Sequence, residues 1–527
     1  MRDQKWLSWP IWLVVLYGFA LALTAAVGTP AAPVPPAPLA NLLDKPFGED
    51  AFYMFSVARN LGTGHGISYG GVPTTGVQPL ATFLYASLYW LTAQTGMSAT
   101  AALRLILVVN VGLLVLTGLL SGVLVSRWLR RRDIAAPRGF WIAATIVVVN
   151  PLAFRLFGYG LETGLYLFTI VALQLAIDAL PNQLKARDLV GLGVLLGLCI
   201  LARLDFIVLG SVLFGWQLLT RRLRFRDAVI IAVVALLVAG PWLAYVYSVA
   251  GHIMPSSGAA EAGVATSVSE LVERSWVMAS AIVGSLSSVI YLPTADPVPI
   301  VLLATVLLIA LLSIRPSIGR FFHENVVWFV GSAVLVVYYV LFSTAAHFYG
   351  RYLAPLWLLW TQLLAAGLAL RLARTPDRVA AWVHHAGAVA LVVLFAAQIG
   401  YTIHRGHAGN SHLFTAFYVR EHAAELGTVG AFQSGLVGYV NDERTINLDG
   451  KLDQHALSRR GQLECYLAER GVSTVIDWPE YIDNGWIDPA FVQSHMREVG
   501  RVPGGMSVIM AVDATPTPCR QGAIAPH

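Results

Sequence analysis

The feature that most constrains this chain is a series of separate apolar blocks, each about 17 to 25 residues long. A helix of that length crosses a hydrocarbon core of about 30 Å, because each residue adds about 1.5 Å. The composition agrees: 57% of the 527 residues are hydrophobic and only 12% are charged, against about a quarter charged in ordinary soluble domains. The sequence therefore predicts an integral membrane protein with several spans.

Basic residues fall in short clusters between these apolar blocks. The clusters are Arg127, Arg130, Arg131, Arg132 and Arg138; Lys185 and Arg187; Arg221, Arg222, Arg224 and Arg226; Arg315 and Arg320; and Arg371, Arg374 and Arg378. Clusters of this kind are typical of cytoplasmic loops, whereas a nucleic-acid site needs a continuous basic stripe. The placement of these clusters, more than the net charge of +5, therefore indicates membrane orientation, and no nucleic-acid partner is expected.

With Met1 inside, the charge pattern predicts about eleven spans and a C-terminus outside. The predicted spans are 9–29, 100–126, 139–157, 163–180, 189–203, 205–220, 228–249, 298–314, 324–343, 352–370 and 379–400. The apolar segment 79–91 is excluded, because a crossing there would move every later basic cluster outside. We expect it to lie along the membrane as a helix, and we expect 271–292 to be an interfacial or external helix.

The predicted organisation is a transmembrane domain over 1–409 and an extracytoplasmic α/β domain over 410–527. The first external loop, 30–99, begins with a Pro-rich stretch and contains a short helix at 49–61 followed by a Gly-rich turn. In the C-terminal domain, helical patterns alternate with short strand-like runs. The predicted helices are 414–426 and 462–470, and the predicted strands are 429–433, 445–448, 473–477 and 507–511.

The three cysteines divide between these two domains. Cys199 lies inside a predicted span, whereas Cys465 and Cys519 both lie in the C-terminal domain. An oxidising compartment permits a disulfide between the latter two, although spacing alone does not establish it.

Acidic residues occur at two places where predicted spans meet the outer face. Glu49 and Asp50 begin the helix of the first loop, and Glu162 lies in a short turn between two spans. A carboxylate at a membrane boundary can act as a general base, because low-dielectric surroundings raise a carboxyl pKa toward the working pH. Asp50 could equally be a helix N-cap, and Glu162 could be an ordinary surface residue. The residues alone leave these alternatives open.

Two arginines are also candidates for function. Arg203 and Asp205 interrupt a long apolar run, either as an outer turn or as a structural ion pair within the bundle. Arg351 and Tyr352 lie at the outer end of a span. A guanidinium offers several fixed donors to a phosphate, but Arg and Tyr at this depth are also common interface anchors.

The remaining polar candidates are hydroxyls and histidines. Ser256 and Ser257 follow the span that ends near residue 249, where they either bind an oxyanion or form an ordinary loop. His384 and His385 have no visible carboxylate or cysteine partners, so we predict no metal site there. The candidate carboxylates, arginines and serines come from distant parts of the sequence yet map to the same boundary, which favours a shared site.

In their order along the chain, these motifs resemble bacterial members of the GT-C superfamily, polytopic glycosyltransferases that use polyprenyl-phosphate sugars. The matching stretches are Glu49-Asp50-Ala51-Phe52-Tyr53, Ala58-Arg59-Asn60, Gly64-His65-Gly66, Thr74-Thr75-Gly76-Val77-Gln78-Pro79-Leu80, Gly160-Leu161-Glu162-Thr163, Leu201-Ala202-Arg203-Leu204-Asp205, Pro255-Ser256-Ser257-Gly258 and Arg351-Tyr352. The stretches 432–439 and 446–450 resemble a recurrent C-terminal domain of relatives of the mycobacterial terminal arabinofuranosyltransferase. Many relatives carry paired aspartates where this chain has Glu49-Asp50, and Asn-Gly and Trp where it has Thr75-Gly76 and Ala81.

The resemblance implies a GT-C fold and inverting transfer of a sugar from a polyprenyl phosphate to an extracytoplasmic glycan, lipid or protein. Asp50 would be the catalytic base, with Glu49 and Glu162 as accessory carboxylates. The expected donor-phosphate ligands are Arg351, Tyr352 and Arg203. The residues expected around the acceptor or cavity are Asp205, His65, Gln78, Ser256 and Ser257.

The expected setting is the bacterial cytoplasmic membrane, with the site and the C-terminal domain facing the periplasm. Expected partners are the bilayer, a polyprenyl-phosphate-linked sugar and an envelope acceptor. The residues indicate no cofactor, although some superfamily members use a divalent metal. The main alternative is a transporter or flippase for a lipid-linked glycan, but the sequence has no internal repeat of the kind that transporters often show.

Overall fold

The computed structural model describes residues 43, 46–134, 136–148, 150–181, 183–287, 319–373, 411–441 and 444–513. By internal contacts the chain divides into two compact units. The first, here called the helical unit, is built mainly on Leu107–Pro241 and the segment that starts at Ala262. The second, the mixed unit, joins the first loop, Trp242–Glu261 and the C-terminal region. The predicted domain boundary at residues 409 and 410 lies outside the described residues.

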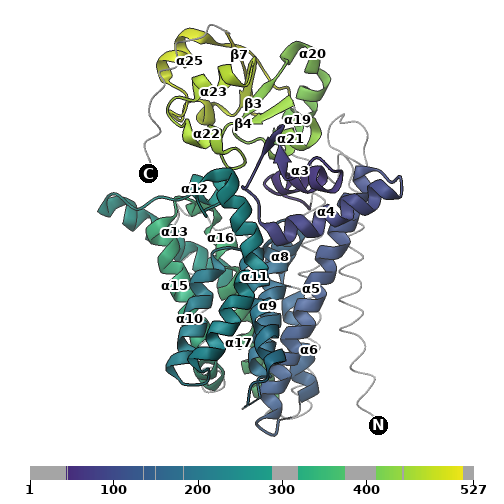
Figure 1. Cartoon of the computed structure of the whole chain (residues 1–527), viewed down its shortest axis with the longest axis vertical. Coiled ribbons are helices and arrows are strands. Elements are labelled where there is room, and N and C mark those ends of the chain that lie inside the picture. Colours follow the sequence, from purple (N-terminus) through teal and green to yellow (C-terminus); the bar gives the residue numbers. More distant parts are fainter. Residues whose placement is uncertain are drawn as a thin grey trace. The chain divides into compact units, whose positions relative to one another are not determined.

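The helical unit contains the long apolar helices of the chain (Figure 1). Its helices are α5 Ala99–Arg130, α6 Ala136–Val148, α7 Pro151–Gly158, α8 Thr163–Asp178, α9 Ala186–Ala202, α10 Phe206–Leu219, α11 Phe225–Ala250, α13 Val268–Ser287, α15 Val326–Phe342, the 3-10 turn Ala346–Phe348, α16 Tyr349–Tyr352 and α17 Ala354–Ala373. The first residues of α5 and the last residues of α11 are grouped with the mixed unit.

The predicted spans that fall within the described residues coincide with these helices, with one correction. The single span predicted over 139–157 is two helices, α6 and α7. The break has a local cause: Pro151 occupies the first turn of α7, and the Asn150 side chain caps that helix by accepting the amide of Leu152. The spans predicted at 9–29, 298–314 and 379–400 lie outside the described residues, and the total of eleven remains a prediction.

Among the described helices, three are long and apolar enough to cross a membrane: Thr100–Arg130, Phe225–Ala250 and Ala354–Ala373. In the apolar 18-residue segment of α17, 72% of the residues are buried inside the protein. In the corresponding segment of α11, only 28% are buried. Trp357 and Trp360 of α17 are buried, whereas Leu236 and Leu237 of α11 are exposed. Thus α17 is central to the helical unit, while α11 presents an apolar surface of the kind that faces lipid.

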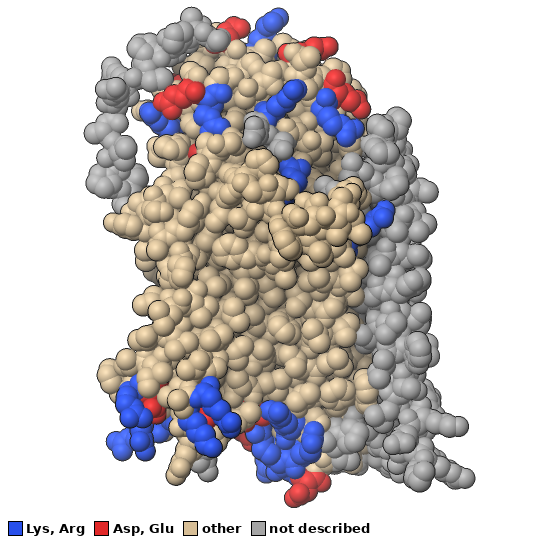
Figure 2. Space-filling view, turned by 45° about the vertical axis from the view of Figure 1, so that its right-hand side comes forward, with Lys and Arg blue, Asp and Glu red and all other residues tan. Residues whose placement is uncertain are grey.

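Basic residues of the helical unit gather at one end of the bundle (Figure 2). Figure 2 shows Lys and Arg gathered there, while the flank of the bundle is bare of charged side chains. Arg127 and Arg131 pair with Asp178, and Arg132 pairs with Glu324. An uncharged flank with basic residues at one end is the distribution expected of a membrane-embedded bundle.

The mixed unit combines the first loop with an α/β fold. From the loop come α3 Ala51–Gly62, the two-stranded β1 Ser68–Tyr69 and β2 Val72–Pro73, and α4 Pro79–Gln94; α12 is Ser256–Ala260. Pro79 starts α4, and Phe55 of α3 packs edge-on against Tyr85 of α4 with ring centroids 5.6 Å apart. The predicted helix at 79–91 is therefore a helix packed on α3, and its placement along a membrane remains a prediction.

The C-terminal region supplies a five-stranded sheet with short helices. Its elements are α19 Ser411–Glu421, α20 Ala423–Leu426, β3 Val429–Ala431, α21 Gly435–Asn441, β4 Thr445–Asn447, α22 Gln454–Ser458, α23 Leu463–Glu469, β5 Thr474–Asp477, α24 Pro479–Ile482, α25 Pro489–His495, β6 Met496–Arg501 and β7 Val508–Val512. The strand order is β4-β3-β5-β7-β6. The first three strands are parallel, and β7 pairs antiparallel with β5 and with β6.

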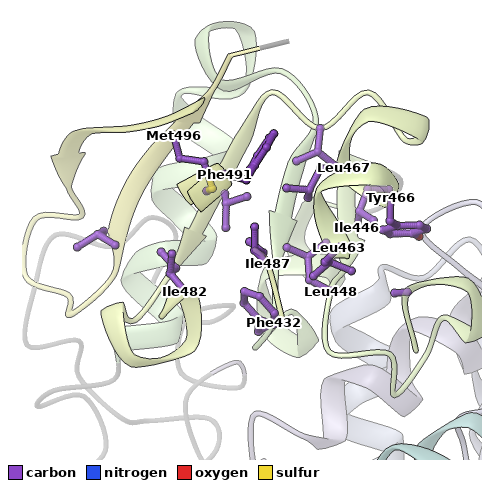
Figure 3. Packing of buried hydrophobic residues seen from close by; sticks show 14 residues of the cluster. Phe432, Ile446, Leu448, Leu463, Tyr466, Leu467, Ile482, Ile487, Phe491 and Met496 are labelled. Atoms are coloured by element: carbon purple, nitrogen blue, oxygen red, sulfur yellow. The ribbon is translucent and has the colours of Figure 1, made fainter. Parts of the chain in front are cut away.

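A buried apolar cluster stabilises this sheet. Phe432, Leu448, Leu463 and Phe491 pack together with aliphatic side chains from the strands and helices (Figure 3). All four predicted strands are present, and the helix predicted over 462–470 is present as α23, because each has a clear local pattern; the single helix predicted over 414–426 is two helices, α19 and α20. The prediction missed β6, whose side chains are mostly exposed, and the short α21, α22, α24 and α25. Cys465 is disulfide-bonded and Cys199 is a free buried thiol; Cys519 lies outside the described residues.

Candidate functional site

Glu49 and Asp50 lie directly before α3, in the mixed unit. Asp50 occupies the N-cap position, but its backbone is helical and its side chain makes no capping hydrogen bond. The alternative that Asp50 only caps the helix is therefore not supported. The Glu49 carboxylate instead accepts the backbone amide of Leu436, in the first turn of α21, at 3.1 Å. The two neighbouring carboxylates thus have different roles in the fold.

The Glu49 side chain is half-buried, and desolvation of its carboxyl group is the main reason that its pKa rises to about 8. The adjacent Asp50 charge raises the pKa further, as does Asp449 to a smaller extent. The Leu436 amide and the Lys451 ammonium oppose this shift. At neutral pH Glu49 is mostly protonated, which removes a negative charge from beside Asp50.

The Lys451 ammonium interacts electrostatically with both Glu49 and Asp50. Its Nζ lies 3.1 Å from Glu261 and 3.7 Å from Asp449. Burial disfavours the charged ammonium, but Asp449, Glu261 and Asp50 outweigh that effect and hold the Lys451 pKa above its ordinary value. Burial in turn raises the pKa of Asp449. Three carboxyl groups therefore raise the pKa of the Lys451 ammonium, and two of them, Asp449 and Glu261, also act on the Arg460 guanidinium.

Ser256 connects the first loop to the turn that carries Lys451. Its hydroxyl donates to the Lys451 carbonyl at 2.8 Å, and its amide donates to the Thr75 hydroxyl at 3.0 Å. A Cβ on Gly76 would lie 1.8 Å from the same Lys451 carbonyl, so only glycine permits this approach. Ser256 thus holds three segments together, and Ser257 follows it, half-buried, in α12.

His65 does not join Asp50. His65 is exposed in the turn after α3, where its Nδ1 lies 2.9 Å from the Thr63 hydroxyl. The intervening helix of 12 residues separates it from Asp50 by about 18 Å along the axis. Gln78 is the N-cap residue of α4, and its Oε1 is buried with no hydrogen-bond partner among the described residues.

In the helical unit, Glu162, Arg203 and Asp205 form one ion-pair cluster. Arg203 is 5% exposed, and its guanidinium lies 2.6 Å from Glu162 and 2.6 Å from Asp205. Tyr339 of α15 donates its hydroxyl to Asp205 and accepts a bond from Arg203 at 3.2 Å. Glu162 ends the turn before α8, so the predicted turn is present. The structure favours the ion-pair interpretation of Arg203 and Asp205, which the sequence left open.

Tyr352 extends this cluster toward Arg351. The Arg203 guanidinium lies 4.7 Å from the Tyr352 ring centroid, and Tyr352 stacks on Tyr339 with ring centroids 4.6 Å apart. Arg351 packs against Phe348, with its guanidinium 4.5 Å from that ring, and also reaches Tyr352 at 5.5 Å. The structure therefore brings together Glu162, Arg203, Asp205 and Tyr352, with Arg351 beside them.

Sequence reasoning missed several residues around both clusters. Lys451, Glu261 and Asp449 surround the first-loop carboxylates, and Tyr339 completes the Arg203 cluster. Asp449 lies inside a stretch that carried the family resemblance, but neither Lys451 nor Glu261 has a local pattern that marks it. Among the described residues, no group of three or more His, Cys, Asp or Glu side chains has the geometry of a metal site.

No family model matches the sequence, and no curated protein matches it. Among solved structures, the chain is similar to ArnT from Cupriavidus metallidurans bound to undecaprenyl phosphate, with a TM-score of 0.57 and 12% sequence identity over 97% of this chain and 98% of that one. The apo state of the same protein gives a TM-score of 0.56 and 13% identity over 98% and 100%. ArnT is a GT-C polyprenyl-phosphate-sugar glycosyltransferase. The predicted resemblance to this superfamily is thus confirmed for the fold.

Proposed function

We propose that this chain is a membrane glycosyltransferase that moves a sugar from a polyprenyl-phosphate donor to an extracytoplasmic acceptor. The observation that carries the proposal is that 97% of the chain follows a fold solved with undecaprenyl phosphate. Two clusters of polar residues in the described chain support an enzyme: the first-loop carboxylates, and the arginines beside Tyr352. A scaffold protein would leave both clusters without a role.

In the proposed reaction, Asp50 removes the proton from an acceptor hydroxyl. The hydroxyl oxygen attacks the anomeric carbon of the donor while the bond to the phosphate oxygen breaks, so the configuration at that carbon inverts. The leaving group is a polyprenyl phosphate, and a guanidinium stabilises its developing charge. The bond of Glu49 to the Leu436 amide, together with its raised pKa, supports the choice of Asp50 and not Glu49 as the base.

Arg351 is the proposed ligand for the donor phosphate, with Tyr352 beside it. Arg203 was a candidate for the same role, but its two ion pairs already balance its charge. We therefore assign it to holding Tyr352 in place through the contact of its guanidinium with that ring. Glu162 and Asp205 would fix the orientation of Arg203, and Ser256 would hold the turn that carries Lys451.

The proposed setting is a bacterial cytoplasmic membrane, with about eleven spans and with the site and C-terminal domain outside. The basic clusters at the ends of α5 and α10 support this orientation. The resemblance of the C-terminal stretches to relatives of the terminal arabinofuranosyltransferase makes pentofuranose donors worth testing beside hexose donors.

Purified protein in liposomes, given radiolabelled polyprenyl-phosphate sugars and envelope glycan acceptors, tests the proposal. We expect label to move from the lipid to the acceptor, with the product inverted at the anomeric carbon. If labelled lipid crosses the bilayer but no acceptor is labelled, the chain is a flippase and the proposal is wrong. Protein-free liposomes and liposomes with Asp50→Asn protein provide the two backgrounds.

A further inference from the structure

The sheet of the mixed unit has a topological switch point between β3 and β5. The chain leaves β3 through α21 toward β4 on one side, and it leaves β5 through α24 and α25 toward β6 on the other. In open α/β sheets, ligands bind outside the carboxyl ends of the strands at such a point. An independent domain with this topology would take a ligand there.

Hydrogen bonds to the end of β5 fix the backbone at this switch point. Asp477, at the end of β5, accepts the amides of Phe432 and Gln433, both at 2.8 Å. These bonds fix the turn that runs from the end of β3 into α21, whose polar backbone groups extend through Ser434 to Leu436. The turn 432–436 therefore presents a rigid set of donors and acceptors.

Side chains of the first loop form hydrogen bonds with these backbone groups. The Tyr53 hydroxyl donates to the Phe432 carbonyl at 3.0 Å and accepts the Ser434 amide at 2.9 Å. The Tyr69 hydroxyl donates to the Ser434 carbonyl, and Glu49 accepts the Leu436 amide. Both tyrosines are buried. These backbone groups of the turn therefore bind side chains of the same protein, in the place where an external ligand would otherwise bind.

At two positions of α21 the first loop approaches so closely that only glycine fits. A Cβ on Gly435 would lie 2.5 Å from Oε1 of Glu49, and a Cβ on Gly438 would lie 1.9 Å from the Tyr69 hydroxyl. Side chains at these positions would therefore push the first loop away. Tyr53 lies three residues after Asp50 in the same helix, so the position of its hydroxyl also fixes the start of α3.

We propose that the switch point of the C-terminal sheet is the receptor for this chain's own first loop, and that Tyr53 and Tyr69 are positioning residues for Asp50. The C-terminal region then serves to hold the catalytic loop, and its switch point does not bind an acceptor. The claim about Asp50 rests on the proposed function, whereas the claim about loop anchoring stands on the hydrogen bonds alone.

The test compares full-length Tyr53→Phe and Tyr53→Phe/Tyr69→Phe with wild type by amide hydrogen exchange and by sugar-transfer kinetics. Loss of a hydroxyl leaves buried backbone groups of the 432–436 turn unsatisfied, so we expect amides in 47–58 to exchange about 10- to 100-fold faster. We expect kcat to fall at least about tenfold while the KM for the donor stays unchanged, because the base is misplaced and the phosphate contacts are not.

Tyr466→Phe is the matched control, since Tyr466 is also buried in the mixed unit and its hydroxyl bonds Asp453. It should reduce thermal stability without changing kcat. Unchanged exchange over 47–58 in the double variant would overturn the anchoring claim, and unchanged kcat with faster exchange would overturn the positioning claim. If wild type transfers no sugar, the proposed function fails, while the exchange experiment still decides the anchoring claim.

Discussion

The two charged clusters of this protein differ in how closely the charges are paired. In the helical unit, one buried guanidinium lies between two carboxylates at 2.6 Å each, and a tyrosine hydroxyl completes the set. In the mixed unit, Asp50, Asp449 and Glu261 act on the ammonium of Lys451, and Asp449 and Glu261 also act on the guanidinium of Arg460. The first cluster has strong direct pairs. The second has longer pairs, at 3.1 and 3.7 Å, and a raised pKa at Glu49 and Asp449.

The difference indicates which cluster can exchange protons. Close ion pairs hold their charges, and a buried pair mainly fixes geometry once it has formed. A carboxyl with a raised pKa next to another carboxylate is typical of acid-base sites, where environments separate the two pKa values. We therefore expect changes in the mixed unit to alter chemistry and pH dependence, and changes in the Arg203 cluster to alter stability.

The largest expected effect comes from Asp50→Asn. Removal of the base should reduce kcat for sugar transfer by about 10²- to 10⁴-fold, because the acceptor hydroxyl loses its proton acceptor. The melting temperature should change little, since the Asp50 side chain makes no capping hydrogen bond. Asp483→Asn, an exposed aspartate in the same unit, is the control. Full activity in Asp50→Asn would refute the base assignment.

Arg203→Leu should produce the largest loss of stability. It leaves Glu162 and Asp205 buried without their cation, which lowers the free energy of unfolding by about 3–5 kcal/mol. The control is Arg187→Leu, which breaks an exposed pair with Asp188 at 3.6 Å and should have an effect below about 1 kcal/mol. Thermal unfolding in detergent measures both. Equal melting temperatures would show that the Arg203 cluster does not stabilise the helical unit.

Gly76→Ala should destabilise the mixed unit by about 1–3 kcal/mol, because the new methyl group overlaps the Lys451 carbonyl. The contact of Ser256 with the same carbonyl should weaken as well, and hydrogen exchange over 449–452 would report it. Gly191→Ala, in α9 with open space around it, is the control and should be neutral or slightly stabilising. Unaltered exchange in Gly76→Ala would contradict the close approach.

The smallest expected effect per measured step concerns pH. The pKa of Glu49 is about 8 in the folded protein against an ordinary value of 4.5, so between these values the folded chain binds the proton more tightly. Stability should therefore fall as pH rises from 4.5 toward 8, by at most about 1.4 kcal/mol per pH unit, and level off above.

Glu49→Gln should remove the contribution of Glu49 to this fall in stability with rising pH. Asp477, whose pKa burial raises to about 7, contributes a slope of the same sign in both proteins, so the difference between wild type and variant isolates Glu49. Melting temperatures at pH 5, 6, 7 and 8 provide the measurement. Parallel curves for the two proteins would mean that Glu49 does not retain its proton on folding.

Local sequence pattern determined the elements of this protein. Apolar blocks of membrane-crossing length predicted α5, α8, α9, α10, α11, α15 and α17, and short apolar runs predicted β3, β4, β5 and β7. Such patterns predict helices and strands because the spacing of apolar residues within one segment determines which of its faces can be buried. Even the split of one predicted span into α6 and α7 has a local cause, at Asn150 and Pro151.

Only the tertiary structure decided which polar groups meet. Glu49 bonds an amide 387 residues away, and Arg203 pairs with a glutamate 41 residues away. No local pattern encodes such contacts, because they depend on how distant segments pack. The sequence therefore identified Asp50, Glu162 and Arg203 as candidates. The structure then assigned Arg203 to an ion pair, and it brought Lys451, which the sequence had not singled out, into the electrostatic surroundings of the first-loop carboxylates.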